Sequence, residues 1–496
     1  MAIQKVCGVE TEYGITHLGV AEPNPITASS LLIQAYVAAV QRRVGWDFED
    51  ETPGRDARGF AREGASAPVV ETHLVNAVLT NGARFYVDHA HPEYSTPECA
   101  TPLDAVRWDR AGELILTRAM AAAAETLPPG QEIVVYKNNS DGKGNSYGCH
   151  ENYLLDREVP FARIVAGILT HFVTRQLYTG AGKVGAEAGG ETDQVTFQLS
   201  QRADFFEEEV GLETTLKRPL VNTRDEPHAD PRKYRRLHVI AGDANLCEVA
   251  TFLKVGVTAL VLSMIEDDFL DLEGLVLAAP VRAVRQVSRD LTFAAPLDLA
   301  DGGTSTALGL QWRLFEQAQK YAESEGLDSL GGSGPEVLAG WERALETLES
   351  DPSLLAGTAD WATKRSLVEA YRERHGLSWR HPRLAQLDLQ YHDLRPGRSL
   401  FARLPSERLL SEEEVRAAVT EPPRTTRAYF RGRCLERWAS SVAAANWDSM
   451  VFDLGGDPLQ RVPMLEPLRG TAEVVDSLFE ECRTPAELLA RLGSEG

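Results

Sequence analysis

The first 250 residues of this chain repeatedly alternate polar and apolar side chains, and this two-residue period constrains the fold more than any other feature. In the segment CGVETEYG, Glu10 and Glu12 stand one residue apart, with Val9, Thr11 and Tyr13 at the flanking positions. Successive side chains of a β-strand point to opposite faces, so we expect the two carboxylates to share one face. They would lie about 6.7 Å apart along the strand. At that spacing they can flank a pair of divalent cations.

Four later segments show the same alternation. Each places charged, imidazole, amide or hydroxyl side chains on one face and largely apolar side chains on the other. These polar faces hold Arg84, Tyr86 and Asp88, then His150 and Asn152, then Gln198, Ser200 and Arg202, and finally Arg236 and His238. A sheet of the five strands would have one apolar side covered by helices and one side forming a charged cavity. Carboxylate and imidazole groups suit Mg²⁺ and arginine suits phosphate, so the pattern predicts a site for metal and polyphosphate.

Each of these residues also has a simpler interpretation. An isolated Glu-x-Glu pair is more often an exposed strand face, but the apolar, glycine-bounded strand around Glu10 and Glu12 favours metal ligation. Taken singly, His150 and His238 are more often ordinary core or surface histidines than ligands; their recurrence on the predicted polar face favours ligation. Asp88 could simply begin a turn. At the end of its strand it could instead act as a base or nucleophile facing the cavity.

Composition excludes several classes of protein. Acidic residues outnumber basic ones by 73 − 51 = 22, and such a surface repels nucleic acid and anionic lipid, so neither is an expected partner. The six cysteines form no CxxC pair and the first residues contain no apolar leader, which favours a reducing cytoplasm. The most apolar stretch, 249–265, predicts a buried helix rather than a membrane span. The glycine-rich segment 180–185 lacks phosphate-loop spacing, and no serine-hydrolase elbow or HExxH motif occurs.

The chain divides into regions of different composition. Residues 46–75 are charged and rich in glycine and proline, and they predict a long surface loop. Residues 137–148 contain turn-forming residues at nearly every position and predict a hairpin loop that helps to shape the site. Residues 255–420 have a mostly helical pattern. A proline pair then ends it, so we expect a large domain over 1–424 and a small one over 425–496.

Seven segments spread over nearly the whole chain resemble the Pup ligase/deamidase family of actinobacteria, relatives of glutamine synthetase and the carboxylate–amine ligases. The segments are GVETEYG, TNGARFYVDHAHPEYSTPEC, YKNNSDGKGNSYGCHENY, GLETTLKRPLVNTRDEPHAD, YRRLHVIAGDANL, TRAYFRG and WDSMVFDLGGDPLQRVPMLEPLRG. The resemblance implies an α+β fold, with a glutamine-synthetase-like cradle of antiparallel β-sheet backed by helices. It also implies ATP and Mg²⁺ in the cradle and a small C-terminal domain alongside.

The resemblance assigns roles residue by residue. The implied Mg²⁺ ligands are Glu10, Glu12, Tyr86, Glu93, His150 and His238. The implied nucleotide contacts are Gly8, Val9, Glu10, Thr11, Glu12, Arg84, Ser95, Thr96, Asn152, Arg236 and Trp447. Asp88 matches the family's catalytic aspartate, and Arg202 and Arg224 are further candidates for binding phosphate or the substrate carbonyl. Without the resemblance, Trp447 would be interpreted as an ordinary core residue.

Two features favour the deamidase branch of this family over the ligase branch. Segment 46–75 resembles a loop that the ligases lack, and the spacing from Asp88 to Pro92 resembles that of the deamidases. The resemblance then implies an Mg–ATP-dependent hydrolase that deamidates the C-terminal glutamine of the prokaryotic ubiquitin-like protein Pup. It also implies cleavage of the Pup–lysine isopeptide bond of pupylated proteins and a link to the bacterial proteasome. The open alternatives are a Pup–protein ligase and a non-catalytic regulator that binds Pup or nucleotide.

Overall fold

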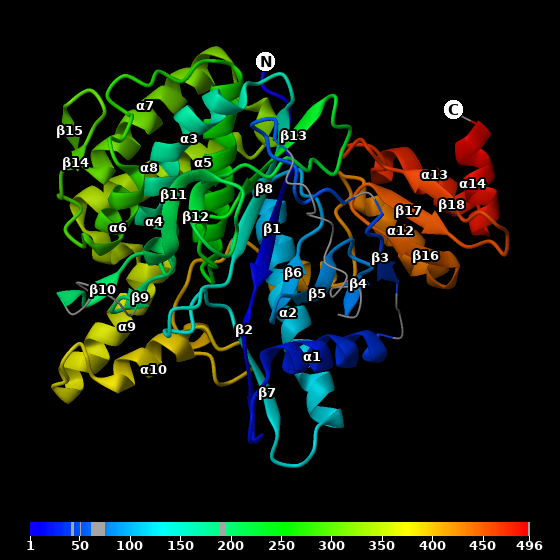
Figure 1. Cartoon of the computed structure of the whole chain (residues 1–496), viewed down its shortest axis with the longest axis horizontal. Coiled ribbons are helices and arrows are strands. Elements are labelled where there is room, and N and C mark those ends of the chain that lie inside the picture. Colours follow the sequence, from blue (N-terminus) through cyan, green and yellow to red (C-terminus); the bar gives the residue numbers. More distant parts are fainter. Residues whose placement is uncertain (41–43, 50, 61–74, 188–193, 495–496) are drawn as a thin grey trace.

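Six β-strands form the central sheet of the protein (Figure 1). The structure, a computed structural model, describes residues 1–40, 44–49, 51–60, 75–187 and 194–494. The strands of the sheet are β1 (Cys7–Glu12), β4 (Asn76–Val78), β5 (Arg84–Asp88), β6 (His91–Ser95), β8 (Cys149–Asp156) and β13 (Tyr234–Val239). Their order is β13-β8-β1-β6-β5-β4, and every neighbouring pair is antiparallel. The predicted antiparallel sheet is therefore confirmed.

The two faces of the sheet differ as the alternation predicts. Along β1, Cys7, Val9 and Thr11 are buried, whereas Glu10 and Glu12 keep partial exposure. The buried face packs against three helices, α1 (Pro25–Ala39), α2 (Pro102–Thr126) and α5 (Glu248–Glu266). The opposite face carries the polar side chains, which line a cavity.

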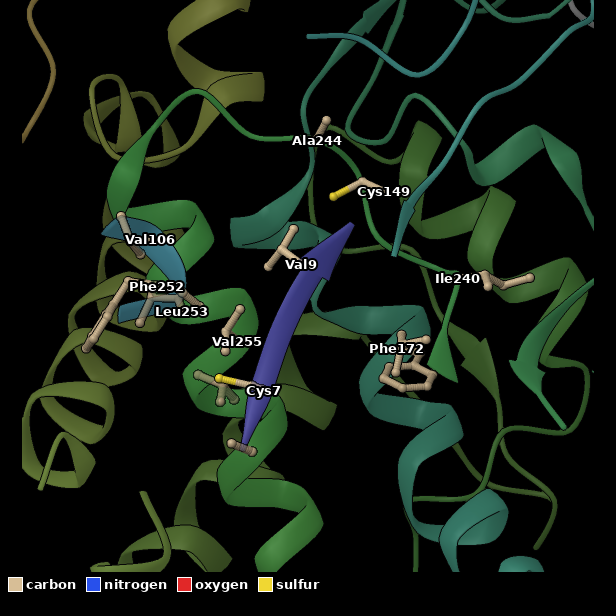
Figure 2. Close-up of a cluster of buried hydrophobic side chains, with 14 of the residues drawn as sticks. Cys7, Val9, Val106, Cys149, Phe172, Ile240, Ala244, Phe252, Leu253 and Val255 are labelled. Carbon is tan, nitrogen blue, oxygen red and sulfur yellow. The ribbon is translucent and has the colours of Figure 1, made fainter. Parts of the chain in front are cut away.

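Helix α5 runs through the core behind β1. Leu253 and Val255 of α5 lie with Cys7 and Val9 of β1 in one buried cluster (Figure 2). Among the described residues, α5 is the one helix long and apolar enough to span a membrane by length and composition, and that whole span is buried inside the protein. Complete burial identifies α5 as a core helix, as expected for segment 249–265.

The region after α5 is mostly helical, as predicted, and forms the green and yellow half of Figure 1. Local sequence explains where some of these helices begin. The Thr306 side chain caps helix α7 (Ala307–Ser324) by accepting a hydrogen bond from the Gly309 N–H. Ser411 forms a capping box with Glu414 at the start of α11 (Glu412–Ala417). The helices after α5 in this region are α6 (Pro280–Arg289), α7 (Ala307–Ser324), α8 (Gly334–Ser350), α9 (Asp360–His375), α10 (Pro382–Tyr391) and α11 (Glu412–Ala417). Two further helices, α3 (Phe161–Thr174) and α4 (Gln176–Thr179), precede α5 in the sequence.

Short two-stranded ribbons surround the central sheet. They are β2 (Gly14–Leu18) with β7 (Glu132–Tyr136), β9 (Lys183–Val184) with β10 (Phe197–Gln198), β11 (Phe206–Gly211) with β12 (Arg218–Asn222), and β14 (Leu297–Asp298) with β15 (Thr304–Ser305). One of the five predicted strands is corrected here. Only Phe197–Gln198 is extended, and it pairs with β9, so Ser200 and Arg202 lie in a turn rather than on a strand of the central sheet.

Two further differences concern connections. The segment His91–Ser95, which was not among the five predicted strands, is strand β6 in the middle of the sheet. Residues 137–148 do not join two paired strands, because β7 pairs with β2 and not with β8. They form a loop closed by a bridge between Ser140 and Ser146.

The C-terminal part forms a compact unit with its own apolar cluster. Its elements are α12 (Ala428–Trp438), β16 (Val442–Ala445), β17 (Ser449–Phe452), β18 (Gln460–Pro463), α13 (Ala472–Glu481) and α14 (Pro485–Ser494). Strand β3 (Gly45–Trp46) joins this sheet by pairing in parallel with β16. Residue 46 is therefore extended rather than part of a loop, and half of the predicted loop 46–75, namely residues 50 and 61–74, lies outside the described residues. The boundary at residue 425 stays a prediction.

Candidate active site

A cavity of about 650 Å³ lies on the polar face of the central sheet. Most of the predicted site residues line it. They are Glu10, Glu12, Arg84, Tyr86, Asp88, Glu93, Ser95, His150, Arg202, Arg224, Arg236, His238 and Trp447. Four of the five segments selected for their alternation supply strands of its floor, and the fifth supplies Arg202 from the wall.

Strand register explains the first cluster on the floor. Antiparallel pairing of β1 with β8 sets Glu10 directly opposite His150, and pairing of β8 with β13 sets Asn152 opposite His238. One carboxylate oxygen of Glu10 and one ring nitrogen of each histidine lie within 4.8 Å of one another. Asn152 Nδ2 donates to Glu10 Oε1 over 2.8 Å, which orients the carboxylate. This donor set can hold a divalent cation.

A second cluster consists of carboxylates. Glu12 pairs across the sheet with Glu93 of β6, and carboxylate oxygens of Glu12, Glu93 and Asp88 lie within 4.8 Å of one another. The Tyr86 hydroxyl donates to Glu93. Burial, and then the negative charges of Asp88, Glu10 and Glu12, raise the pKa of Glu93 well above its usual range. A hard cation would relieve this repulsion, and carboxylate oxygens are the ligands that Mg²⁺ prefers.

Asp88 is the last residue of β5 and precedes a short turn into β6. The next residue, His89, adopts a left-handed backbone with φ 50°, and its Nδ1 lies 2.9 Å from Asp88 Oδ2. Burial alone would raise the pKa of Asp88, but the hydrogen bond and charge of His89 outweigh it and lower the pKa. An ionised carboxylate facing the cavity can act as a nucleophile or as a general base.

A narrower cavity of about 80 Å³ adjoins the first along the beginning of β1. Its lining contains eight of the predicted nucleotide contacts, Gly8, Val9, Glu10, Ser95, Thr96, Asn152, Arg236 and Trp447. Apolar groups from Leu154, Pro227 and Pro467 complete the wall. A polar floor that continues into an apolar slot is an arrangement that fits a nucleotide, with the phosphates on the floor and the base in the slot.

Trp447 is held in place by neighbours of the C-terminal unit. The Arg431 guanidinium lies 5.2 Å from the centre of its ring, and the Trp46 ring contacts its edge at 5.2 Å between centroids. Arg431 in turn donates to the carboxylate of Glu98 and to the Gly82 carbonyl oxygen of the catalytic part. The C-terminal unit thus forms one wall of the site.

Two residues of the predicted nucleotide strand do not face the cavity with their side chains. Thr11 is fully buried, and its hydroxyl lies 3.9 Å from Cys149 Sγ on the helix-covered face, so its side chain does not face the cavity and its assignment as a nucleotide contact stays a prediction. The Val9 side chain also packs in the core. Only the Val9 backbone reaches the slot, and its N–H donates to Thr96 Oγ1 over 3.0 Å.

Three of the four predicted arginines occupy different settings. Arg84 stacks between the rings of Trp46 at 4.0 Å and Tyr86 at 3.8 Å. Arg224 forms an ion pair with Glu226, with Nε 3.2 Å from Oε2. Arg202 is buried in the cavity wall and bonds to backbone carbonyls rather than to a carboxylate.

Several lining residues were not predicted from the sequence, among them Glu51, His91, Ser146, Arg218, Glu226 and His228. His91 had a usable signal, because it stands two residues before Glu93 and so shares its face of β6. Arg218 and Ser146 had none. They reach the cavity from a ribbon and a loop whose positions depend on tertiary packing.

This cradle of metal-binding and phosphate-binding groups over an antiparallel sheet defines an enzyme site of the glutamine-synthetase-like kind, and the sequence places it in one family. Residues 5–451 match the family model described as Pup-ligase protein, so the chain belongs to that family. It is 54% identical to a depupylase of Acidothermus cellulolyticus and 49% identical to a Pup deamidase/depupylase of Mycolicibacterium smegmatis. Each match covers 99% of this chain, and 99% and 100% of the relative.

Ligases of the family are more distant. A Pup–protein ligase of Nakamurella multipartita is 38% identical over 96% of this chain and 99% of its own length. The crystal structure of Pup in complex with its ligase PafA matches with a TM-score of 0.79 and 34% identity over 99% of this chain and 95% of that chain. A structure of PafA in complex with ADP matches with a TM-score of 0.74 and 38% identity over 84% and 92%. The predicted family and fold are thereby confirmed.

Proposed function

We propose that this chain is a Pup deamidase and depupylase. It hydrolyses the side-chain amide of Pup's C-terminal glutamine and the isopeptide bond between Pup and a substrate lysine. Relatives named for these activities share 54% and 49% of its residues, whereas the ligase relative shares 38%. This difference favours the hydrolase over the ligase.

One observation in the site carries the proposal. Asp88 stands at the end of β5 with a carboxylate oxygen within 4.8 Å of donor atoms on Glu12 and Glu93, facing the cavity. It attacks the side-chain carbonyl carbon, or takes a proton from the water that does so. The carbon–nitrogen bond then breaks, and ammonia or the lysine amine leaves with a proton that water supplies, directly or through Asp88. Where Asp88 is the nucleophile, a water molecule then hydrolyses its mixed anhydride with the substrate side chain and restores the carboxylate. Cavity arginines stabilise the negative charge that develops on the carbonyl oxygen.

The donor atoms of the floor fit Mg²⁺ and a nucleotide. Glu10, His150 and His238 would hold one cation, and Glu12 with Glu93 a second, with Tyr86 beside them. A bound cation supplies charge stabilisation for the phosphates and for the developing oxyanion. The slot beside Trp447 would take the base of ATP. The related PafA was solved with ADP, which supports a nucleotide in this position.

Further parts of the proposal concern partners and location. The PafA complex contains Pup, and the related enzymes are named for Pup chemistry, which supports Pup and pupylated proteins as substrates. A functional link to the bacterial proteasome follows from such a role. All six cysteines are unpaired and buried, which suits a reducing cytoplasm.

Ammonia release tests the proposal directly. The protein is mixed with ATP, Mg²⁺ and Pup ending in glutamine, and ammonia is measured against time. We expect release at a rate that depends on Asp88, without stoichiometric ADP. A second reaction supplies Pup ending in glutamate together with a lysine-bearing acceptor. Conjugate formation with stoichiometric ADP there, and no ammonia in the first reaction, would assign the chain to the ligases.

A further inference from the structure

Two arginines of the cavity wall, Arg202 and Arg218, differ from their neighbours in what their guanidiniums contact. Arg202 lies in the turn before β11 and is 1% exposed, and Arg218 is the first residue of β12. Both line the main cavity. Within the described ranges, neither guanidinium forms an ion pair. The other three arginines of this cavity differ, since Arg224 and Arg236 each lie within 4.0 Å of a Glu226 oxygen, and the Arg84 guanidinium is covered by the rings of Trp46 and Tyr86.

Neutral acceptors hold the two guanidiniums side by side. Ser146 accepts from both, through its Oγ from Arg202 Nε at 3.3 Å and through its carbonyl oxygen from Arg218 Nη2 at 3.0 Å. Arg202 Nη1 donates to the Gly242 carbonyl oxygen at 3.2 Å, and Arg218 Nε to that of Thr214 at 2.9 Å. Arg202 Nη2 and Arg218 Nη1 form no hydrogen bond to the described part of the chain. Each arginine therefore keeps donors available to a ligand in the cavity.

Little negative charge lies near the guanidiniums of Arg202 and Arg218. Burial, and then the positive charge of Arg218, lower the pKa of Arg202 to about 10, and burial lowers the pKa of Arg218. Glu12 is the carboxylate that most offsets this effect at both residues. Glu12 also belongs to the cation-binding cluster with Asp88, so its charge is shared. A buried guanidinium beside a partly buried one favours an anion next to them.

The position of the pair separates it from the nucleotide slot. The slot lies at Gly8, at the beginning of β1, and the arginines lie near Glu12, at the end of the same strand. These two points are about 13 Å apart along the strand. Asp88 lies on the Glu12 side of the floor. An anion held by the arginines would therefore sit beside the reacting carbonyl group and away from the base.

The proposed substrate carries such an anion. Its reacting amide belongs to the side chain of a C-terminal residue, so the same residue has a free α-carboxylate. That carboxylate is free in both deamidation and depupylation, because both act on the side chain. The α-carboxylate and the side-chain carbonyl carbon lie about 5 Å apart across four carbon–carbon bonds. A carboxylate is also the planar anion that paired guanidiniums bind best.

We propose that Arg202 and Arg218, positioned by Ser146, bind the α-carboxylate of the substrate's C-terminal residue. This inference rests on the proposed function and adds a specificity determinant to it. Recognition of the α-carboxylate restricts hydrolysis to a terminal glutamine or glutamyl residue and excludes glutamines inside a chain. It also fixes the side-chain carbonyl beside Asp88.

The test compares two substrates and two proteins. Pup ending in glutamine is prepared with a free α-carboxylate and with an α-carboxamide, and kcat/KM for ammonia release from the side chain is measured for wild type and Arg218→Gln. We expect wild type to prefer the free carboxylate at least about tenfold. Arg218→Gln should remove that preference by slowing only the carboxylate substrate, while the dissociation constant for ADP stays within about twofold. Arg282→Gln on the exposed part of α6 is the matched control and should keep the full preference.

Binding provides a second measurement that does not depend on catalysis. Fluorescence anisotropy with labelled Pup ending in glutamate, as α-carboxylate or α-carboxamide, should show the same preference in wild type and its loss in Arg218→Gln. Equal kcat/KM and equal affinity for both forms in wild type would overturn the inference. So would a variant that weakens ADP binding and slows both substrates equally, because the pair would then serve phosphate. Absence of ammonia with the affinity difference retained would reject the proposed hydrolase activity and keep the carboxylate site.

Discussion

The two faces of the central sheet are made by neighbouring residues of the same strands, yet their environments are opposite. On the cavity face, Glu10 and His150 contribute to one group of possible metal ligands, and Asp88 contributes to a second. On the helix-covered face, Val9 and Phe85 are buried in a continuous apolar core. A strand can supply both because its side chains alternate. Function and stability are therefore divided here between alternate positions of each strand rather than between separate regions.

The largest effect is expected on the cavity face. Asp88→Asn removes the ionised carboxylate while keeping the size of the side chain, so ammonia release from Pup ending in glutamine should fall at least about 10³-fold. Nucleotide affinity, measured by calorimetry with ADP, should change by less than about threefold. The control Asp301→Asn alters an exposed aspartate far along the chain and should leave the rate unchanged. Asp88→Asn activity within tenfold of wild type would remove Asp88 from the mechanism.

The next effect belongs to the opposite face. Phe85 is fully buried and its ring contacts Tyr36 edge-on at 5.9 Å. Phe85→Ala should lower the free energy of unfolding by about 3–5 kcal/mol through lost burial and a new cavity. Urea unfolding followed by circular dichroism measures this loss. The adjacent Tyr86→Phe should lower stability by no more than about 1.5 kcal/mol. If Tyr86→Phe destabilised the protein as much as Phe85→Ala, the division between faces would be wrong.

A buried ion pair at the junction of the two units should give an intermediate effect that depends on pH. Burial alone would raise the pKa of Glu98, but Arg431 and Arg427 lower it from 4.5 to about 2. A lowered folded-state pKa stabilises the fold fully above the unfolded value and loses that contribution as the pH falls from about 4.5 towards 2. The contribution is roughly 3 kcal/mol at neutral pH.

Thermal unfolding of wild type and Glu98→Gln between pH 7 and pH 3 measures this contribution. The variant should be less stable than wild type at pH 7, and the difference should shrink as the pH falls through this window. A difference that is constant with pH would show that Glu98 does not act through its charge.

The smallest expected effect concerns the slot. Trp447→Leu removes the aromatic surface beside the proposed base site, and the affinity for ADP should fall by roughly tenfold. Trp379→Leu, at a partly buried tryptophan outside both cavities, is the matched control and should leave ADP affinity unchanged. Equal ADP affinity in wild type and Trp447→Leu would place the base elsewhere.

The sequence was sufficient for the part of the site that depends on strand period. Glu10, Asp88, His150 and His238 stand on strands long enough for alternation to be visible, and each of them lines the cavity. The alternation failed for Ser200, because a period of two in a short segment does not distinguish a sheet strand from an extended stretch before a turn. The resemblance assigned Thr11 to the nucleotide although the alternation already placed it on the opposite face.

Other features depend on contacts between distant segments and leave no local pattern. Trp46 and β16 are separated by about 400 positions, and their pairing follows from packing of the C-terminal unit. Arg218 lies on a parallel ribbon outside the sheet, and Ser146 on a loop, so only the folded chain brings them to one wall. Strand β6 was not among the five predicted strands, because its five-residue segment contains Pro92 and proline is uncommon inside a sheet.

The proposed function requires divalent cations that are bound by side chains from alternate positions of neighbouring strands. Diffraction from crystals grown with Mn²⁺ and a non-hydrolysable ATP analogue, recorded at the manganese absorption edge, locates these ions directly. We expect anomalous peaks within coordination distance of Glu10, His150 and His238 and of Glu12 and Glu93, with the phosphates between them and the base beside Trp447. Manganese ions bound elsewhere on the protein, with these five side chains contacting only solvent, would contradict this prediction.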